Sequence, residues 1–214
     1  EPRCPLHRRC GGCQIQALSY EKQLEYKEQK VREDLIRIGG FADPLVFPVL
    51  GMDEPYHYRN KAQFPFGRNR EGRIVTGFYA GRTHTIVPGT DCAIGVPENK
   101  QILELILDFI EKHGIAPYDE TTGKGLLRHA LIRKGFATGE LMVCLVINGR
   151  SFPHVEELAD RLFEIPGMTS FSLNVNQKNT NVILGEEVIS VRGQTYITDR
   201  IGGVSYQISP LSFY

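Results

Sequence analysis

Three cysteines near the start of the chain and a fourth far downstream form the pattern with the clearest chemical meaning. Cys4, Cys10 and Cys13 lie in CPLHRRCGGC, and Cys92 lies in GTDCAIG. Five residues separate Cys4 from Cys10, and two separate Cys10 from Cys13. Three clustered thiols plus one remote thiol is a recurrent way to hold a cubane iron–sulfur cluster, because each iron takes one thiolate. The spacing therefore predicts a [4Fe–4S] site.

Two other uses of these thiols remain open at this point. Four cysteines can form two disulfides, although the chain does not otherwise look like a small secreted protein. Structural zinc takes the same ligand type, but zinc sites usually combine two CxxC pairs, and only Cys10 and Cys13 have that spacing. The fifth cysteine, Cys144, lies in the apolar run LMVCLVI, which predicts a buried and inert thiol.

A second stretch, residues 56–88, combines basic and aromatic side chains. It carries six basic residues and one acidic residue, six minus one or plus five, in a chain whose formal net charge is zero. Basic side chains neutralise phosphates and aromatic rings stack on unpaired bases, so the stretch indicates RNA binding. The alternative is a solvated sheet with its aromatic residues in the core. The candidate RNA contacts are Arg59, Lys61, Phe64, Arg68, Arg70 and Arg73.

Length and composition exclude several classes of protein. The 214 residues are enough for one large or two modest domains, with 25 basic and 25 acidic side chains. The sequence has no apolar run long enough to span a membrane and no signal-peptide pattern. Free thiols in a cluster motif predict a reducing, cytoplasmic location. Nucleotide-binding glycine motifs, a P-loop, HExxH and GxSxG are all absent from the sequence.

The elements that must position these residues follow from periodicity. Leu24, Val31, Leu35 and Ile38 share one face of an expected helix over residues 19–38, capped by Ser19. Two more helices are expected over residues 97–113 and 153–163. Expected strands cover residues 61–67, 73–80, 83–87, 126–134, 140–147, 169–176, 188–191, 195–198 and 204–208. The prediction is an α+β fold with three helices and mainly antiparallel β sheets, in part ferredoxin-like.

The motifs, taken in order, resemble a known family. CPLHRRCGGCQIQ, YHYRNKAQFPF, TDCAIG and YQISPLSFY resemble the RNA uracil-5-methyltransferases, in particular the RumA-like iron–sulfur branch that methylates 23S ribosomal RNA. The likeness runs through essentially the whole chain. The transfer-RNA branch generally lacks the cluster, so the four cysteines favour the ribosomal branch.

This resemblance implies a division of labour. Family members look like a TRAM β-barrel, a central cluster-bearing domain and a Rossmann-like domain that uses S-adenosylmethionine. The chain would be a fragment holding only the central part, with the catalytic residues beyond Tyr214 and no catalytic activity of its own. Residues 1–48 would form the cluster loop and long helix, and residues 49–214 the RNA-recognition domain. Phe213 matches a family phenylalanine close to the substrate base.

Two further hypotheses concern partners. The chain is alternatively a stand-alone iron–sulfur or zinc module that binds RNA without catalysis, and a redox role ranks below both because no flavin or nicotinamide motif accompanies the cysteines. The helix over residues 19–38 would pack on the missing catalytic domain in relatives. Its apolar stripe is therefore expected to drive self-association of the chain through a two-fold contact. The alternative is an ordinary amphipathic helix buried on its own domain.

Overall fold

A seven-stranded sheet forms the centre of the computed structural model, which describes residues 1–213. The strand order is β3-β2-β1-β4-β5-β6-β7, and every neighbouring pair is antiparallel except β5 and β6. The strands are β1 (Lys61–Arg68), β2 (Ile74–Tyr79), β3 (Ile86–Pro88), β4 (Leu127–Lys134), β5 (Leu141–Ile147), β6 (Met168–Val175) and β7 (Glu187–Gly193). The parallel pair follows from a helical crossover, because parallel neighbours need a long connection.

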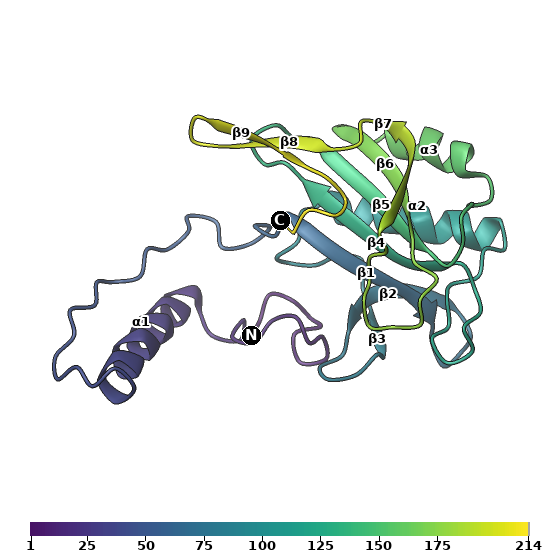
Figure 1. The fold of residues 1–214 in the computed structure, drawn as a ribbon. Helices are drawn as coiled ribbons and strands as arrows, with labels where there is room; N and C mark the ends of the chain where they lie inside the picture. The colour runs from purple at the N-terminus through teal and green to yellow at the C-terminus, as the bar shows by residue number, and fades with distance from the viewer. Residues whose placement is uncertain (214) are drawn as a thin grey trace.

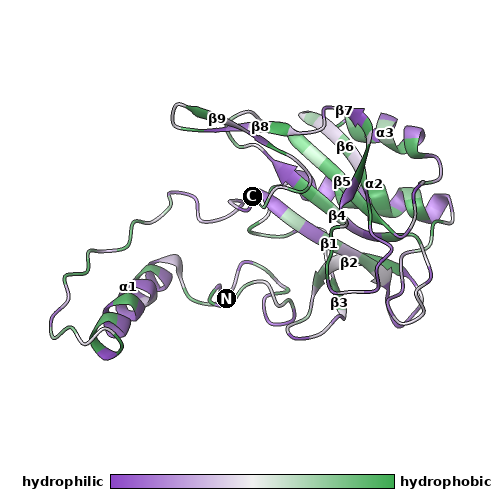
Figure 2. Cartoon of the chain, viewed as in Figure 1, coloured by the Kyte–Doolittle hydropathy of each residue, from purple (hydrophilic) through white to green (hydrophobic). Residues whose placement is uncertain are grey.

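Two helices cover one face of this sheet (Figure 1). They are α2 (Glu98–Lys112) and α3 (Val155–Phe163), and α3 provides the crossover between β5 and β6. Both helices place their apolar stripe on the sheet, with Ile102, Ile106 and Phe109 of α2 fully buried. Figure 2 shows the hydrophobic residues concentrated along the central strands. Each fully buried side chain of this size contributes about 1.5–3 kcal/mol.

A short hairpin, β8 (Ile197–Ile201) and β9 (Val204–Ile208), packs separately from the helices. Ile197 and Ile208 form a small cluster with Met142 of β5. The carboxylate of Asp199 accepts hydrogen bonds from the backbone N–H groups of residues 136 and 137, at 3.0 and 2.8 Å. The hairpin is therefore fastened to the turn between β4 and β5 by charge-assisted hydrogen bonds.

The first helix, α1 (Tyr20–Arg37), stands apart from the sheet (Figure 1). Ser19 caps it, because the side chain of Ser19 accepts a hydrogen bond from the backbone N–H of Lys22 at 3.4 Å. None of its 18 residues, all described, is buried. The helix is held instead by the returning connection: Arg32 donates to the carbonyls of Pro44 and Val46, and the Tyr20 hydroxyl accepts from the Met52 N–H at 2.6 Å.

The α+β class, the three helices and the mainly antiparallel pairing are confirmed, with each element within a few residues of its expected range. The ferredoxin-like part is not confirmed. The elements α2, β4, β5, α3 and β6 follow the expected order, but β1 and β7 continue their sheet on both sides into one seven-stranded sheet. The division at residue 48 stays a prediction. Among residues 1–213, no helix has the length and apolar character needed to cross a membrane.

The exposed stripe on α1 yields a prediction. Val31 is 50% exposed and Ile38 83% exposed, whereas Leu24 and Leu35 are half-buried. We expect the chain to self-associate through this stripe and the double variant Leu24→Glu, Leu35→Glu to sediment as a monomer. Because α1 adds no side chain to the core, the variant's unfolding free energy should stay within about 0.5 kcal/mol of the parent's.

Analytical ultracentrifugation and urea unfolding provide the two measurements. A monomeric parent chain combined with a double variant that unfolds would show that α1 belongs to the core of its own domain.

Candidate metal centre and nucleic-acid groove

Four thiols from two distant parts of the chain line a single small cavity. Cys4, Cys10, Cys13 and Cys92 surround it, together with apolar side chains that include Phe78. All four cysteines have free thiols and are half-buried. Burial raises the pKa of the Cys13 thiol, and the neighbouring charges of Cys92, Cys10 and Cys4 raise it further.

The cysteine loop reaches its position by lying directly against β2. The Gly11 N–H donates to the Tyr79 carbonyl at 3.0 Å, and Cys10 forms an isolated β-bridge with Ala80. A Cβ atom on Gly11 would lie 2.9 Å from the Gly81 Cα and 3.2 Å from the Tyr79 carbonyl oxygen. Only glycine allows this approach, because any side chain would collide with backbone atoms.

Gln16 fastens the other end of the loop. Its side chain is buried, and its Oε1 accepts a hydrogen bond from the Cys4 N–H at 3.3 Å. Its Nε2 lies 3.8 Å from the Cys13 Sγ as a hydrogen-bond donor. An N–H donor beside a sulfur stabilises the thiolate, which is the form that binds metal. Sequence reasoning passed over Gln16, since a lone glutamine after a cysteine motif has no distinctive spacing.

Cys92 is presented by a turn that precedes α2. The Gly95 N–H donates to the Cys92 carbonyl at 3.0 Å, which closes the turn. The segment over residues 57–59 pairs with this turn. The His57 N–H donates to the Ala93 carbonyl at 3.1 Å, and the Arg59 N–H donates to the Ile94 carbonyl at 2.8 Å. The remote thiol is therefore held by backbone hydrogen bonds on rigid structure, whereas the first three lie on a loop.

A broad groove lies on the other side of β2 and β3. Its volume is about 1000 Å³, and it runs between the β1–β2 turn and the loop over residues 116–125. The Tyr79 and His84 rings stack in it at 5.3 Å between centroids, and the Arg128 guanidinium lies 4.5 Å from the centre of the Tyr118 ring. The basic side chains along the groove are Arg9, Arg68, Arg70, Lys124 and Arg128. The exposed basic side chains and the exposed His84 ring are groups that a single-stranded nucleic acid could contact.

The candidate RNA contacts do not form one patch. Arg68 and Arg70 line the broad groove, and Arg73, also exposed, pairs with Glu71 at 3.5 Å. Arg59 lines a second, smaller groove with Tyr56 and Tyr58 beside the cysteine loop.

Lys61 lies apart from both grooves. It is half-buried, its ammonium group lies 5.2 Å from the centre of the Phe213 ring, and it donates a hydrogen bond to the Phe213 carbonyl. Burial lowers the pKa of Lys61, and the charge of Arg133 lowers it further. Phe213 itself is 84% exposed.

The prediction that Phe64 contacts RNA is wrong, because the side chain is buried. It is 0% exposed, and its ring packs 4.8 Å from the ring of Phe78. Along β1 the side chains alternate between the two faces of the sheet, and Phe64 shares the inner face with Ala62 and Phe66. Its ring is therefore part of the hydrophobic core and is not available to RNA.

Arg128 and His129 were missed by the sequence reasoning, which read residues 126–134 as an ordinary hairpin strand. Both are buried, and the Arg128 Nη1 donates to the carbonyls of Asn176 and Lys178 at 2.8 and 2.9 Å. Arg and His at adjacent positions of the strand LRHALIRK, directly before its apolar ALI segment, were the signal that could have found them. Both line the groove, where the Arg128 guanidinium contributes positive charge.

The curated proteins that the chain resembles are named as RNA methyltransferases. No family model matches the chain. It is 43% identical over 215 residues to a protein of Clostridium tetani (strain Massachusetts / E88) named "Uncharacterized RNA methyltransferase", a match that covers 100% of the chain and 46% of the relative. A protein of the same name from Bacillus cereus (strain ATCC 14579) is 44% identical over 218 residues, covering 100% of the chain and 47% of that relative. The chain spans about half the length of the curated relatives it matches.

A solved structure gives a more particular likeness. The Pyrococcus abyssi tRNA (uracil-54, C5)-methyltransferase, solved in complex with S-adenosyl-L-homocysteine, superposes with a TM-score of 0.73 and 28% sequence identity. The match covers 99% of this chain and 48% of that one. The chain is therefore similar in both sequence and fold to RNA methyltransferases over its full described length.

The buried His129 gives a pH prediction. Burial lowers its pKa to about 4, and the Arg128 charge acts in the same direction. Protonation therefore favours the unfolded chain, where a histidine pKa is about 6.5, so stability is complete above that pH and is lost as pH falls toward 4. We expect the parent chain to lose about 2 kcal/mol more unfolding free energy between pH 7 and pH 5 than His129→Leu does.

Urea unfolding at the two pH values is the measurement. His84→Ala provides the control, because His84 is exposed and should leave the difference unchanged. Equal pH dependence in the parent and in His129→Leu would contradict the prediction.

Proposed function

We propose that this chain is the RNA-recognition region of an S-adenosylmethionine-dependent RNA uridine C5-methyltransferase. The observation that carries the proposal is the likeness over 99% of the chain to the tRNA (uracil-54, C5)-methyltransferase from Pyrococcus abyssi. The broad groove supports it, because arginines and the exposed His84 ring line a space large enough for several nucleotides. Methyl transfer itself belongs, on this proposal, to the half of the relatives that the chain does not span.

The reaction of the whole protein would proceed by covalent activation of the base. A cysteine thiolate adds to C6 of the uracil ring and makes C5 nucleophilic. C5 then takes the methyl group from the sulfonium of S-adenosylmethionine, which leaves as S-adenosylhomocysteine. A base removes the C5 proton, and the thiolate departs as the C5–C6 double bond re-forms. No residue of this chain is assigned to those steps; its task is to hold RNA while the target base leaves its stack.

The four-thiol cavity fits a [4Fe–4S] cluster. Cys4, Cys10, Cys13 and Cys92 would each bind one iron, because all four line the same cavity and each iron of the cluster takes one thiolate. The bound cluster would supply a rigid cross-link between the cysteine loop and the turn before α2. Arg59, whose charge lowers the pKa of the Cys13 thiol, and the Gln16 amide would help keep the thiols ionised.

We propose 23S ribosomal RNA as the substrate, on the strength of the four-cysteine motif. Transfer RNA is the alternative, because the solved relative acts on tRNA according to its title. Binding measured against both RNAs under identical salt separates the two substrates.

A first test concerns the cluster. We expect the anaerobically purified chain to contain about four irons and four inorganic sulfides and to show broad visible absorption. Cys92→Ser should lose this absorption, because the cluster would lack its one ligand outside the loop. Cys144→Ser is the matched control: Cys144 is 0% exposed on β5, away from the cavity lining, and the variant should retain iron. One zinc per chain, or iron retained by Cys92→Ser, would contradict the assignment.

A second test concerns the groove. Removing one phosphate contact should weaken binding at low salt and reduce the slope of log K against log salt by about 0.7 for single-stranded RNA. We expect this of Arg68→Ala and Arg70→Ala measured by fluorescence anisotropy. Lys178→Ala, an exposed cation outside the groove lining, should leave the slope unchanged. Identical slopes in all three variants and the parent would favour a merely solvated sheet.

A further inference from the structure

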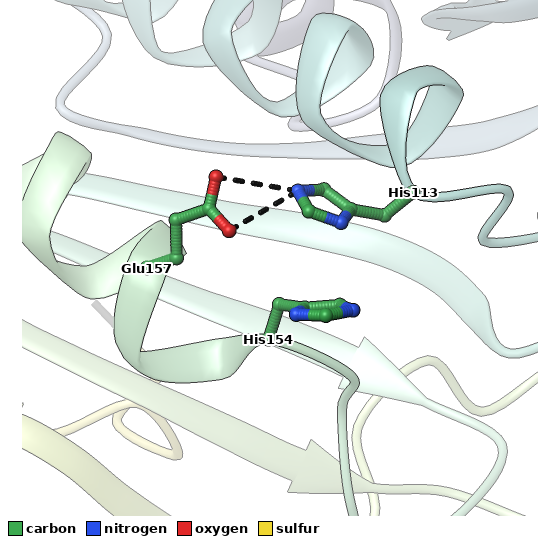
Figure 3. Close-up of side chains that lie close together, drawn as sticks. All are labelled: His113, His154 and Glu157. Atoms are coloured by element: carbon green, nitrogen blue, oxygen red, sulfur yellow. Dashed lines mark hydrogen bonds and ion pairs between the residues drawn. The ribbon is translucent and has the colours of Figure 1, made fainter.

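A second cluster of metal-ligating side chains lies between the two helices that cover the sheet. His113 is the C-cap of α2, His154 is the N-cap of α3, and Glu157 lies in the first turn of α3. One ligand atom of each lies within 4.8 Å of one ligand atom of both others. Figure 3 shows the Glu157 carboxylate facing the His113 ring, with the His154 ring beneath it. His154 and Glu157 are three residues apart, but His113 lies on another helix, so sequence reasoning found no pairing among the histidines.

We propose that His113, His154 and Glu157 form a binding site for a zinc ion. Two imidazoles and one carboxylate are a common donor set for zinc, and a fourth position is left for water. Donors that share a tetrahedral zinc at about 2.0 Å lie about 3.3 Å apart. The His113 Nε2 and the Glu157 carboxylate are 3.3 Å apart, so this edge of the site already has the required separation.

The His113 ring is held in place for this role. It packs against Phe109 on one side, with 4.4 Å between centroids, and against His154, with 4.3 Å. Its side chain is only 12% exposed. A ligand fixed by packing loses little conformational entropy when it binds metal.

The backbone at His154 is a second, independent observation. Its φ is 53° and its ψ 32°, the left-handed region, and it makes no side-chain capping hydrogen bond to α3. That conformation is unfavourable for a residue other than glycine. The left-handed backbone places the His154 imidazole against the His113 ring. Zinc binding would offset the unfavourable backbone conformation.

Lys112 opposes the metal. Its ammonium group lies 2.8 Å from the Glu157 Oε1 and, with His113, lowers the pKa of that carboxyl. The carboxylate is thereby kept ionised, but zinc must displace the lysine or compete with its charge. This competition separates a metal site from an ordinary ion pair, because only a metal site should bind zinc more tightly once Lys112 is removed.

Calorimetric titration with Zn²⁺ tests the proposal on the full chain and on variants that all keep the four cysteines, so uptake by thiols cancels in the comparison. Relative to the parent, His154→Ala should lose one bound zinc per chain or weaken that zinc by at least about tenfold. Glu157→Gln should weaken it in the same way, and Lys112→Ala should tighten it. His84→Ala, which removes an exposed histidine paired with Glu120 elsewhere, should match the parent.

Two results would overturn the site. One is zinc uptake by His154→Ala and Glu157→Gln that equals the parent's. The other is a Lys112→Ala variant with zinc affinity no higher than the parent's, which would show that the three side chains form only an ion pair with stacked rings.

Discussion

The position of the cysteine loop depends on a contact between two backbones. Gly11 lies against Tyr79 and Gly81 at distances that no side chain would tolerate, and one hydrogen bond, from Gly11 to Tyr79, joins the loop to β2 there. One backbone hydrogen bond contributes about 1 kcal/mol, whereas ordering each residue of the loop costs about as much or more. The contact sets where the loop lies, but thiol ligation across the cavity is what would make that position stable.

The same loop contributes to both grooves. Arg9, one residue before Cys10, lines the broad groove, and Cys13 lines the smaller groove beside Arg59. A loop held against β2 therefore places one cation and one wall where RNA would bind. On the proposed function, the cluster would be a structural element of RNA recognition, because it would fix the cysteine loop against β2. The core lies between the sheet and the helices α2 and α3.

Much of this architecture is predictable from local pattern. The apolar stripe of α2, the near-continuous apolar run of β5 and the Ser19 cap all specify their elements through periodicity or a single hydrogen bond. The sheet order was not predictable, because strand pairing between β1 and β4 joins residues about 70 positions apart and no local signal encodes it.

The candidate site was also predictable only in part. Four cysteines at informative spacing indicate a metal centre through residue type and sequence position alone. The prediction for Phe64 was wrong because alternation along β1 decides which face a ring occupies, and an aromatic residue between cations looks the same in either register. His113 carries no spacing signal, since tertiary packing alone brings it to His154 and Glu157.

Hydrogen exchange at the Gly11 amide tests most directly whether metal ligation holds the loop in place. This amide donates to the Tyr79 carbonyl only while the loop lies against β2. In the iron-loaded chain we expect slow exchange at Gly11, and after iron removal under reducing conditions we expect fast exchange there with unchanged protection of β4 and β5. Equal protection of Gly11 in the loaded and iron-free chains would show that the loop holds its place without ligation and would contradict the account.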